Sequence, residues 1–109
     1  MPSRIGVLKR IEKVYDGFAT ESAVTSTSVG HFTSSIYAPS GEPPATEAFV
    51  TIESAPISYC YNGSNPSATS GHIQPKDTSF IIEGLNNIEN FGWTSATGLN
   101  GKIKVTYDR

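Results

Sequence analysis

Residues 48–53 read AFVTIE, and their alternation of side chains decides the fold class. Ala48, Val50 and Ile52 form one series, and Phe49, Thr51 and Glu53 form the other. Successive side chains of an extended strand point to opposite faces, so this two-residue period predicts a strand with one face against a core. Residues 102–107, KIKVTY, alternate in the same way, with lysines and a threonine on the wet face. Both stretches therefore indicate strands of an antiparallel sheet.

Further strands are expected on both sides of these two stretches. Turn-forming residues separate them, including the pair Asp16-Gly17, the proline-containing loop 38–45 and the polar segment 62–71. Residues 5–15 fit either a helix or a strand, and the turn that follows them favours a strand. The other expected strands are residues 18–29, 31–37, 57–61, 78–83 and 88–94.

About eight short strands, with turns roughly every eight to twelve residues, are typical of an antiparallel sandwich, a jelly roll or a small barrel. We expect a single all-β domain, an antiparallel β-sandwich or a jelly-roll-like fold, because 109 residues suffice for one modest core. Residues 46–109 are expected to form the sandwich core. Residues 1–37 are expected to form an N-terminal β-hairpin or arm of the same domain, which offers an edge for assembly by strand addition.

The composition is compatible with a surface that partners cover in part. Serine and threonine supply 25 of the 109 residues, whereas charged residues make up only 17%. Threonine suits half-exposed strands and serine suits turns. A freely soluble monomer carries more charge than this chain does.

The formal net charge of −2 is unevenly distributed along the chain. Residues 1–15 carry a balance of +3, residues 16–97 one of −7 and residues 98–109 one of +2. One interpretation is that lysine and arginine keep the terminal strands solvated and protect the sheet edges. The other is that the basic ends meet an acidic neighbour, such as another copy of the chain. The overall acidity argues against general nucleic-acid binding.

No residue pattern indicates an enzyme, a metal site or a cofactor site. The single cysteine, Cys60, lies in an alternating strand and leaves no internal disulfide. His31 and His72 lack the spacing of metal ligands and of a nucleophile–base pair. The chain also has no signal-peptide segment and no stretch of membrane-spanning length. We therefore expect no catalytic residues, no cofactor, no membrane contact and synthesis in a reducing cytoplasm.

Aromatic side chains are the better candidates for binding. Most of them are expected in the core, Phe91 and Tyr59 above all, because little else in the chain is bulky. The glycine and threonine that flank Trp93 fit a rim position as well as the core. At a rim, Trp93 with Tyr59 or Tyr61 would provide a stacking platform for sugars.

Residues 57–72, ISYCYNGSNPSATSGH, carry a family resemblance. This stretch resembles a strand–turn pattern, I-x-Y-x-Y-(D/N)-G-S-x-P-(T/S)-x-x-x-G-H, of small accessory proteins in tailed-phage virions. In that family an A-F-(I/V)-T-(I/V)-E strand precedes the pattern, as in residues 48–53, and a closing (V/I)-T-Y follows, as in residues 105–107. A hydrophobic strand after an acidic turn also fits, as in residues 75–82. The resemblance covers about residues 46–107.

The same Y-x-Y-N-G-S-x-P core is also similar to β-sandwich modules appended to chitin-processing glycosidases. Its asparagines, glycine and proline meet demands of backbone geometry, so the motif alone leaves both families open. The absent signal peptide and the free-standing length favour the phage family.

The phage resemblance implies a virion structural protein that is made in the host cytoplasm. It would be a capsid decoration (cement) protein or a head–tail accessory protein, would contact capsid, connector or tail subunits, and would form a homo-oligomer. The alternative is a carbohydrate-binding β-sandwich module.

Overall fold

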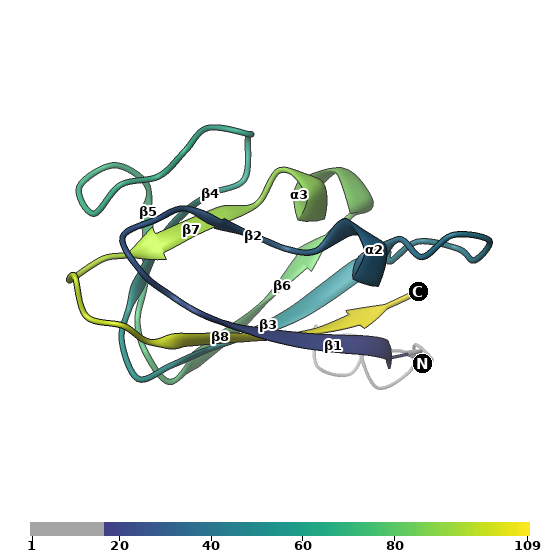
Figure 1. The fold of residues 1–109 in the computed structure, drawn as a ribbon, viewed down its shortest axis with the longest axis horizontal. Helices are drawn as coiled ribbons and strands as arrows, with labels where there is room; N and C mark the ends of the chain where they lie inside the picture. Colours follow the sequence, from purple (N-terminus) through teal and green to yellow (C-terminus); the bar gives the residue numbers. More distant parts are fainter. Residues whose placement is uncertain (1–16) are drawn as a thin grey trace, which may run out of the picture.

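The structure is a computed structural model that describes residues 17–109. These residues form two antiparallel sheets of four strands each (Figure 1). The first sheet contains, in spatial order, β1 (Gly17–Val24), β8 (Lys102–Asp108), β3 (Glu47–Glu53) and β6 (Thr78–Glu83). The second contains β2 (Gly30–His31), β7 (Gly92–Ser95), β4 (Ile57–Cys60) and β5 (His72–Gln74). Two short helices, α2 (Ser34–Tyr37) and α3 (Leu85–Glu89), lie in the connections.

The chain passes from one sheet to the other at nearly every connection. Among the described strands, β4 and β5 are the only successive pair that stays within one sheet. The resulting orders, β1-β8-β3-β6 and β2-β7-β4-β5, are those of an eight-stranded jelly roll. The predicted all-β fold, a sandwich or jelly-roll-like domain of about eight short strands, is confirmed.

The core lies between the two sheets. In β3, Ala48, Val50 and Ile52 are fully buried, whereas the alternate residues are partly exposed, as the two-residue period predicts. Full burial of a valine or isoleucine side chain stabilises the fold by about 1.5–3 kcal/mol. The same core receives aromatic rings from both sheets and from the α2 segment, namely Phe32, Tyr37, Phe91, Trp93 and Tyr107.

Strand β3 has a partner on each side, whereas β6 is an outer strand. Val50 of β3 lies opposite Val105 on β8 and opposite Phe80 on β6. Among the described strands, β6 pairs with β3 alone, and β5 pairs with β4 alone. The outer strands of the two sheets thus include β6 and β5, which follow each other in the chain.

Several predicted strands are confirmed with small changes of boundary. Residues 78–83 form β6, residues 57–60 form β4, and β8 extends one residue beyond the predicted end. The predicted strand 18–29 is shorter than expected, because β1 ends at Val24. Residues 5–15 and Asp16 of the expected turn lie outside the described part of the chain. From Gly17 onward, β1 pairs with β8.

The prediction of a strand at residues 31–37 is wrong beyond His31. Residues 34–37 instead form α2, in which the N–H of Tyr37 donates to the carbonyl oxygen of Thr33 at 3.2 Å. This turn buries both Phe32 and Tyr37, which a straight strand with side chains on alternate faces would place on opposite sides.

The strand predicted at residues 88–94 begins later than expected, and β5 was not predicted. Ile88 lies in α3, where its N–H donates to the carbonyl oxygen of Gly84 at 3.2 Å, and β7 starts at Gly92. Strand β5 has no buried residue, so it left no hydrophobic period in the sequence.

Candidate functional site

A cleft of about 250 Å³ opens between β4, β6 and the α3 segment. Its lining is largely apolar, and its only charged side chain among the described residues is that of Glu83. Concave, mostly apolar pockets with few polar groups are the usual form of binding sites. The lining residues are Tyr59, Tyr61, Phe80, Ile81, Ile82, Glu83, Asn87 and Phe91.

The cleft is open because the second sheet is shorter than the first on this side. Strand β5 has three residues and pairs only with Ile57–Tyr59 of β4, whereas β6 has six residues. Past Tyr59, no described strand continues β4 on the β5 side. The interior between the sheets is therefore accessible beside the second half of β6.

Stacked aromatic rings form the inner wall of the cleft. The ring of Tyr59 stacks on Phe91 with 5.0 Å between centroids and on Phe80 with 5.7 Å. Phe91 in turn stacks on Phe32 at 5.3 Å and lies 6.1 Å from Trp93. Each such pair stabilises the fold by about 0.5–1.5 kcal/mol beyond the burial of its rings. The wall of the cleft is therefore continuous with the core through this series of ring contacts.

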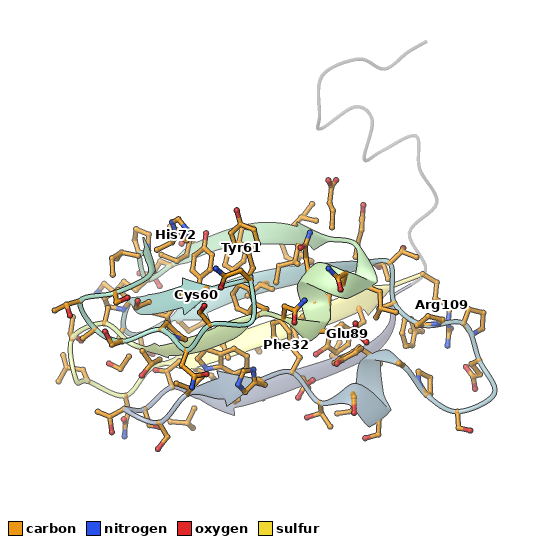
Figure 2. The ribbon with its side chains drawn as sticks, turned by 90° about the horizontal axis from the view of Figure 1, so that it is seen from above. Phe32, Cys60, Tyr61, His72, Glu89 and Arg109 are labelled. Carbon is orange, nitrogen blue, oxygen red and sulfur yellow. The ribbon has the colours of Figure 1, made fainter. Side chains whose placement is uncertain are left out.

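The outer rim of the cleft holds an exposed tyrosine and an exposed histidine. Tyr61 is 50% exposed, and its ring centroid lies 6.0 Å from that of His72. His72 also packs on Tyr59 at 5.4 Å. Figure 2 shows Tyr61, His72 and Cys60 gathered on one side of the molecule, where these three and Asn62 line a smaller hollow of about 190 Å³.

Strand β6 contributes residues from both of its faces. Phe80 and Ile82 point into the sandwich, while Ile81 on the outer face is 38% exposed. The side-chain amide of Asn87 donates to the backbone carbonyl oxygen of Glu83 at 2.9 Å, which ties α3 to the end of the strand. The cleft is thus lined by residues of β6 and α3 as well as by the aromatic rings.

The tyrosines with shifted pKa lie in the core rather than in this cleft. Burial, and then a hydrogen bond from its hydroxyl to Glu21, raises the pKa of Tyr107 far above its usual range. Burial, and then the charges of Glu89 and Glu21, raises the pKa of Tyr37. Both hydroxyls therefore stay protonated at neutral pH.

The structure separates the three aromatic residues that the sequence suggested as a platform. Trp93 is 3% exposed and belongs to the core, Tyr59 is partly buried in the cleft wall, and Tyr61 is exposed at the rim. Phe91 is buried, as predicted. The cleft residues of β6 were not suggested by the sequence, although the alternation in residues 78–83 was the signal that could have indicated them.

The two histidines lie on opposite outer strands of the second sheet. His31 is on β2, with its Nδ1 3.2 Å from the carbonyl oxygen of Phe91, and His72 is on β5. Within residues 17–109, no three His, Cys, Asp or Glu side chains are grouped so as to hold a metal ion. In the same part of the chain, neither helix has the length and apolar character needed to cross a membrane.

No family model, no curated protein and no solved structure matches this chain. The function is therefore inferred from the geometry of the cleft and of β6.

Proposed function

We propose that the protein is a structural component of a phage virion, either a capsid decoration protein or a head–tail accessory protein. It acts through protein–protein contacts with other virion subunits and with copies of itself. The observation that carries this proposal is the combination of an outer strand, β6, with an aromatic cleft directly beside it.

The chemistry of this surface is that of a protein interface. The central part of an interface is rich in aromatic residues and poor in charge. Around the cleft, the exposed side chains include Tyr61 and Ile81, and Glu83 supplies the one charge among the lining residues. Such a surface favours a protein partner over a charged ligand.

The fold and the sequence resemblance support the same proposal. Jelly rolls occur in viral capsid proteins and also in lectins, so the fold admits a virion role by analogy without requiring it. The likeness of residues 46–107 to phage accessory proteins adds weight to the virion role. Such a protein would be made in the host cytoplasm and located in the particle.

Carbohydrate binding is the second candidate function. It is favoured by the exposed rings of Tyr61 and His72 and by the two polar side chains, Glu83 and Asn87, in the cleft. We place it second because Tyr59 already stacks on two protein rings and because Trp93 is buried.

The virion role is tested by co-sedimentation of the protein with phage particles isolated from the same source. We expect the purified protein to band with the particles in a density gradient at a fixed ratio to the major capsid protein. Tyr61→Ala should lower this ratio, because Tyr61 lines the cleft, whereas Leu99→Ala should not, because Leu99 is also an exposed apolar residue but lies outside the cleft. A wild-type protein that never bands with particles would remove the proposal.

A further inference from the structure

The hydrogen-bond pattern of β6 shows which of its backbone groups face outward. The N–H of Gly84 donates to the carbonyl oxygen of Thr46 at 2.8 Å, and the register of β3 and β6 places these two residues opposite each other. In an antiparallel ladder, directly bonded pairs alternate with unbonded ones. The backbone groups of Phe80 and Ile82 therefore face β3.

The backbone groups of the alternate residues, Ser79, Ile81 and Glu83, consequently point away from β3. The contact of Asn87 agrees with this assignment, because its amide reaches the carbonyl oxygen of Glu83 from the outer side. Among the described strands, none pairs with this edge of β6. The N–H and carbonyl groups of Ser79 and Ile81 and the N–H of Glu83 are thus spaced for another strand, while the carbonyl oxygen of Glu83 already accepts from Asn87.

This edge lacks the features by which proteins usually prevent strand addition. Outer strands are commonly protected by proline, lysine, bulges or very short length. Strand β6 reads TSFIIE, has six residues, and keeps an unbroken register with β3. Its one charged residue is Glu83 at the end. The centre of the strand is open to a partner.

We propose that two copies of the chain pair antiparallel through β6, about a twofold axis at Ile81. This proposal rests on the proposed function, because it identifies the protein that contacts β6 as a second copy of the chain. It joins the two first sheets into one continuous sheet across the axis. Because a twofold contact is closed, the pairing buries the open edge without starting a fibre.

Charge and backbone direction select this register. Residues that face outward must oppose one another, so the twofold axis has to pass through a residue and not between two residues. Near the centre of the strand, the possible positions are Phe80, Ile81 and Ile82. An axis at Phe80 would bring Glu83 beside the turn before β6 that holds Asp77, and like charges close to each other destabilise a sheet. An axis at Ile82 would require pairing by residue 85, which begins α3.

An axis at Ile81 avoids both difficulties. Ile81 then opposes Ile81 of the second copy, and Glu83 opposes Ser79, so the carboxylate meets a hydroxyl. On the inner face, Phe80 opposes Ile82 of the second copy in an unbonded pair, where side chains lie closest. Both of these residues line the cleft, so the two clefts meet across the axis and cover each other's apolar walls.

Light scattering after size exclusion tests the dimer. We expect the wild-type protein to have the mass of two chains across a concentration series. Ile81→Lys places two cations opposite each other at the axis and should give the mass of one chain with an unchanged circular-dichroism spectrum. Ile73→Lys is the matched control, because Ile73 is an exposed isoleucine on the outer strand of the other sheet, and it should remain a dimer. A monomeric wild type, or a dimer that Ile81→Lys leaves intact, overturns the pairing.

Disulfide trapping tests the register in a Cys60→Ser background, which removes the native thiol. Residues in a bonded antiparallel pair have Cα atoms about 5.5 Å apart, within the roughly 4.4–6.8 Å range that a disulfide bridges. Ile81→Cys should therefore form a linked dimer on mild oxidation. Ser79→Cys should not form this link, because position 79 opposes position 83 of the second copy. The two cysteines would therefore lie four residues apart along the paired strands, about 13 Å. The double variant Ser79→Cys, Glu83→Cys should link again.

The outcomes separate this pairing from the virion role. A monomer that still bands with particles overturns the dimer and leaves the proposed function standing. A dimer that never bands with particles does the reverse. A link formed by Ser79→Cys alone, with none at position 81, overturns the axis at Ile81.

Discussion

Tyr107 and the carboxylate of Glu21 together connect three parts of the chain. Its ring is fully buried and packs against Phe32 and Tyr37, with centroids at 5.9 and 5.8 Å. Its hydroxyl donates a hydrogen bond to Oε1 of Glu21 on β1. The same carboxylate accepts from the N–H of Thr33 at 3.0 Å and from its Oγ1 at 2.9 Å. Strand β8, strand β1 and the start of α2 are thereby held together.

Tyr107→Phe should destabilise the protein by about 1.5–3 kcal/mol at pH 7, the usual contribution of a hydrogen bond to a charged group. The ring remains, so the packing is kept and the loss reports the hydroxyl alone. Urea unfolding followed by circular dichroism measures the change. Tyr61→Phe removes a hydroxyl from an exposed ring and is the control, with an expected change near zero.

The same tyrosine makes the fold sensitive to alkaline pH. The pKa of Tyr107 is raised from its ordinary value of 10.0, first by burial and then by the Glu21 hydrogen bond. Below pH 10 both the folded and the unfolded chain keep this proton, so its contribution to stability is fully present. Above pH 10 the unfolded chain releases the proton while the folded chain retains it, so the free energy of unfolding falls. Tyr107→Phe should flatten this decline, and an unchanged alkaline slope would contradict the assignment.

At the scale of elements, strands with one buried face could be predicted from the sequence. Strands β3, β6 and β8 alternate because their inner residues fill the core and their outer residues meet water. Helices α2 and α3 could not be predicted, because four or five residues are too few to display a helical period. Strand β5 owes its existence to pairing with β4 rather than to side-chain burial, so no local pattern indicates it.

Strand β2 depends on a glycine for its pairing with β7. Gly30 lies opposite Trp93, and a Cβ atom at position 30 would lie 2.7 Å from Cε2 of that indole. Gly30→Ala should therefore cost about 1–3 kcal/mol, the range for overpacking a filled core. Urea unfolding measures the loss, and Trp93→Phe in the same chain should recover part of it by providing space. If Gly30→Ala is as stable as the wild type, β2 does not pack as described.

At the scale of the whole molecule, the aromatic character of the site could be predicted, but its geometry could not. Tyr59 and Tyr61 were candidates because of their residue type, and both line the cleft. Phe91 reaches Tyr59 because β7 pairs with β4 in the same sheet, whereas Phe80 reaches it because β6 belongs to the sheet that faces them. No spacing in the sequence encodes that meeting, since it depends on the order of strands in both sheets.

The jelly roll occurs both in capsid proteins and in lectins, so the fold does not distinguish a virion role from carbohydrate binding. The properties of the cleft have to distinguish them. Trp93 is 3% exposed, and its ring lies 5.0 Å from Phe32. We expect blue-shifted emission that acrylamide quenches weakly and that becomes red-shifted and accessible in urea.

Titration with chitin oligosaccharides should leave this emission unchanged, because we propose that the cleft is a protein interface and not a sugar site. Since Phe91 links the cleft wall to Trp93 at 6.1 Å, a sugar that entered the cleft and shifted the wall would be detected by the indole. A saturable change in emission that Tyr61→Ala abolishes, and Leu99→Ala retains, would therefore assign the cleft to carbohydrate. The virion role would then lose the surface on which it rests.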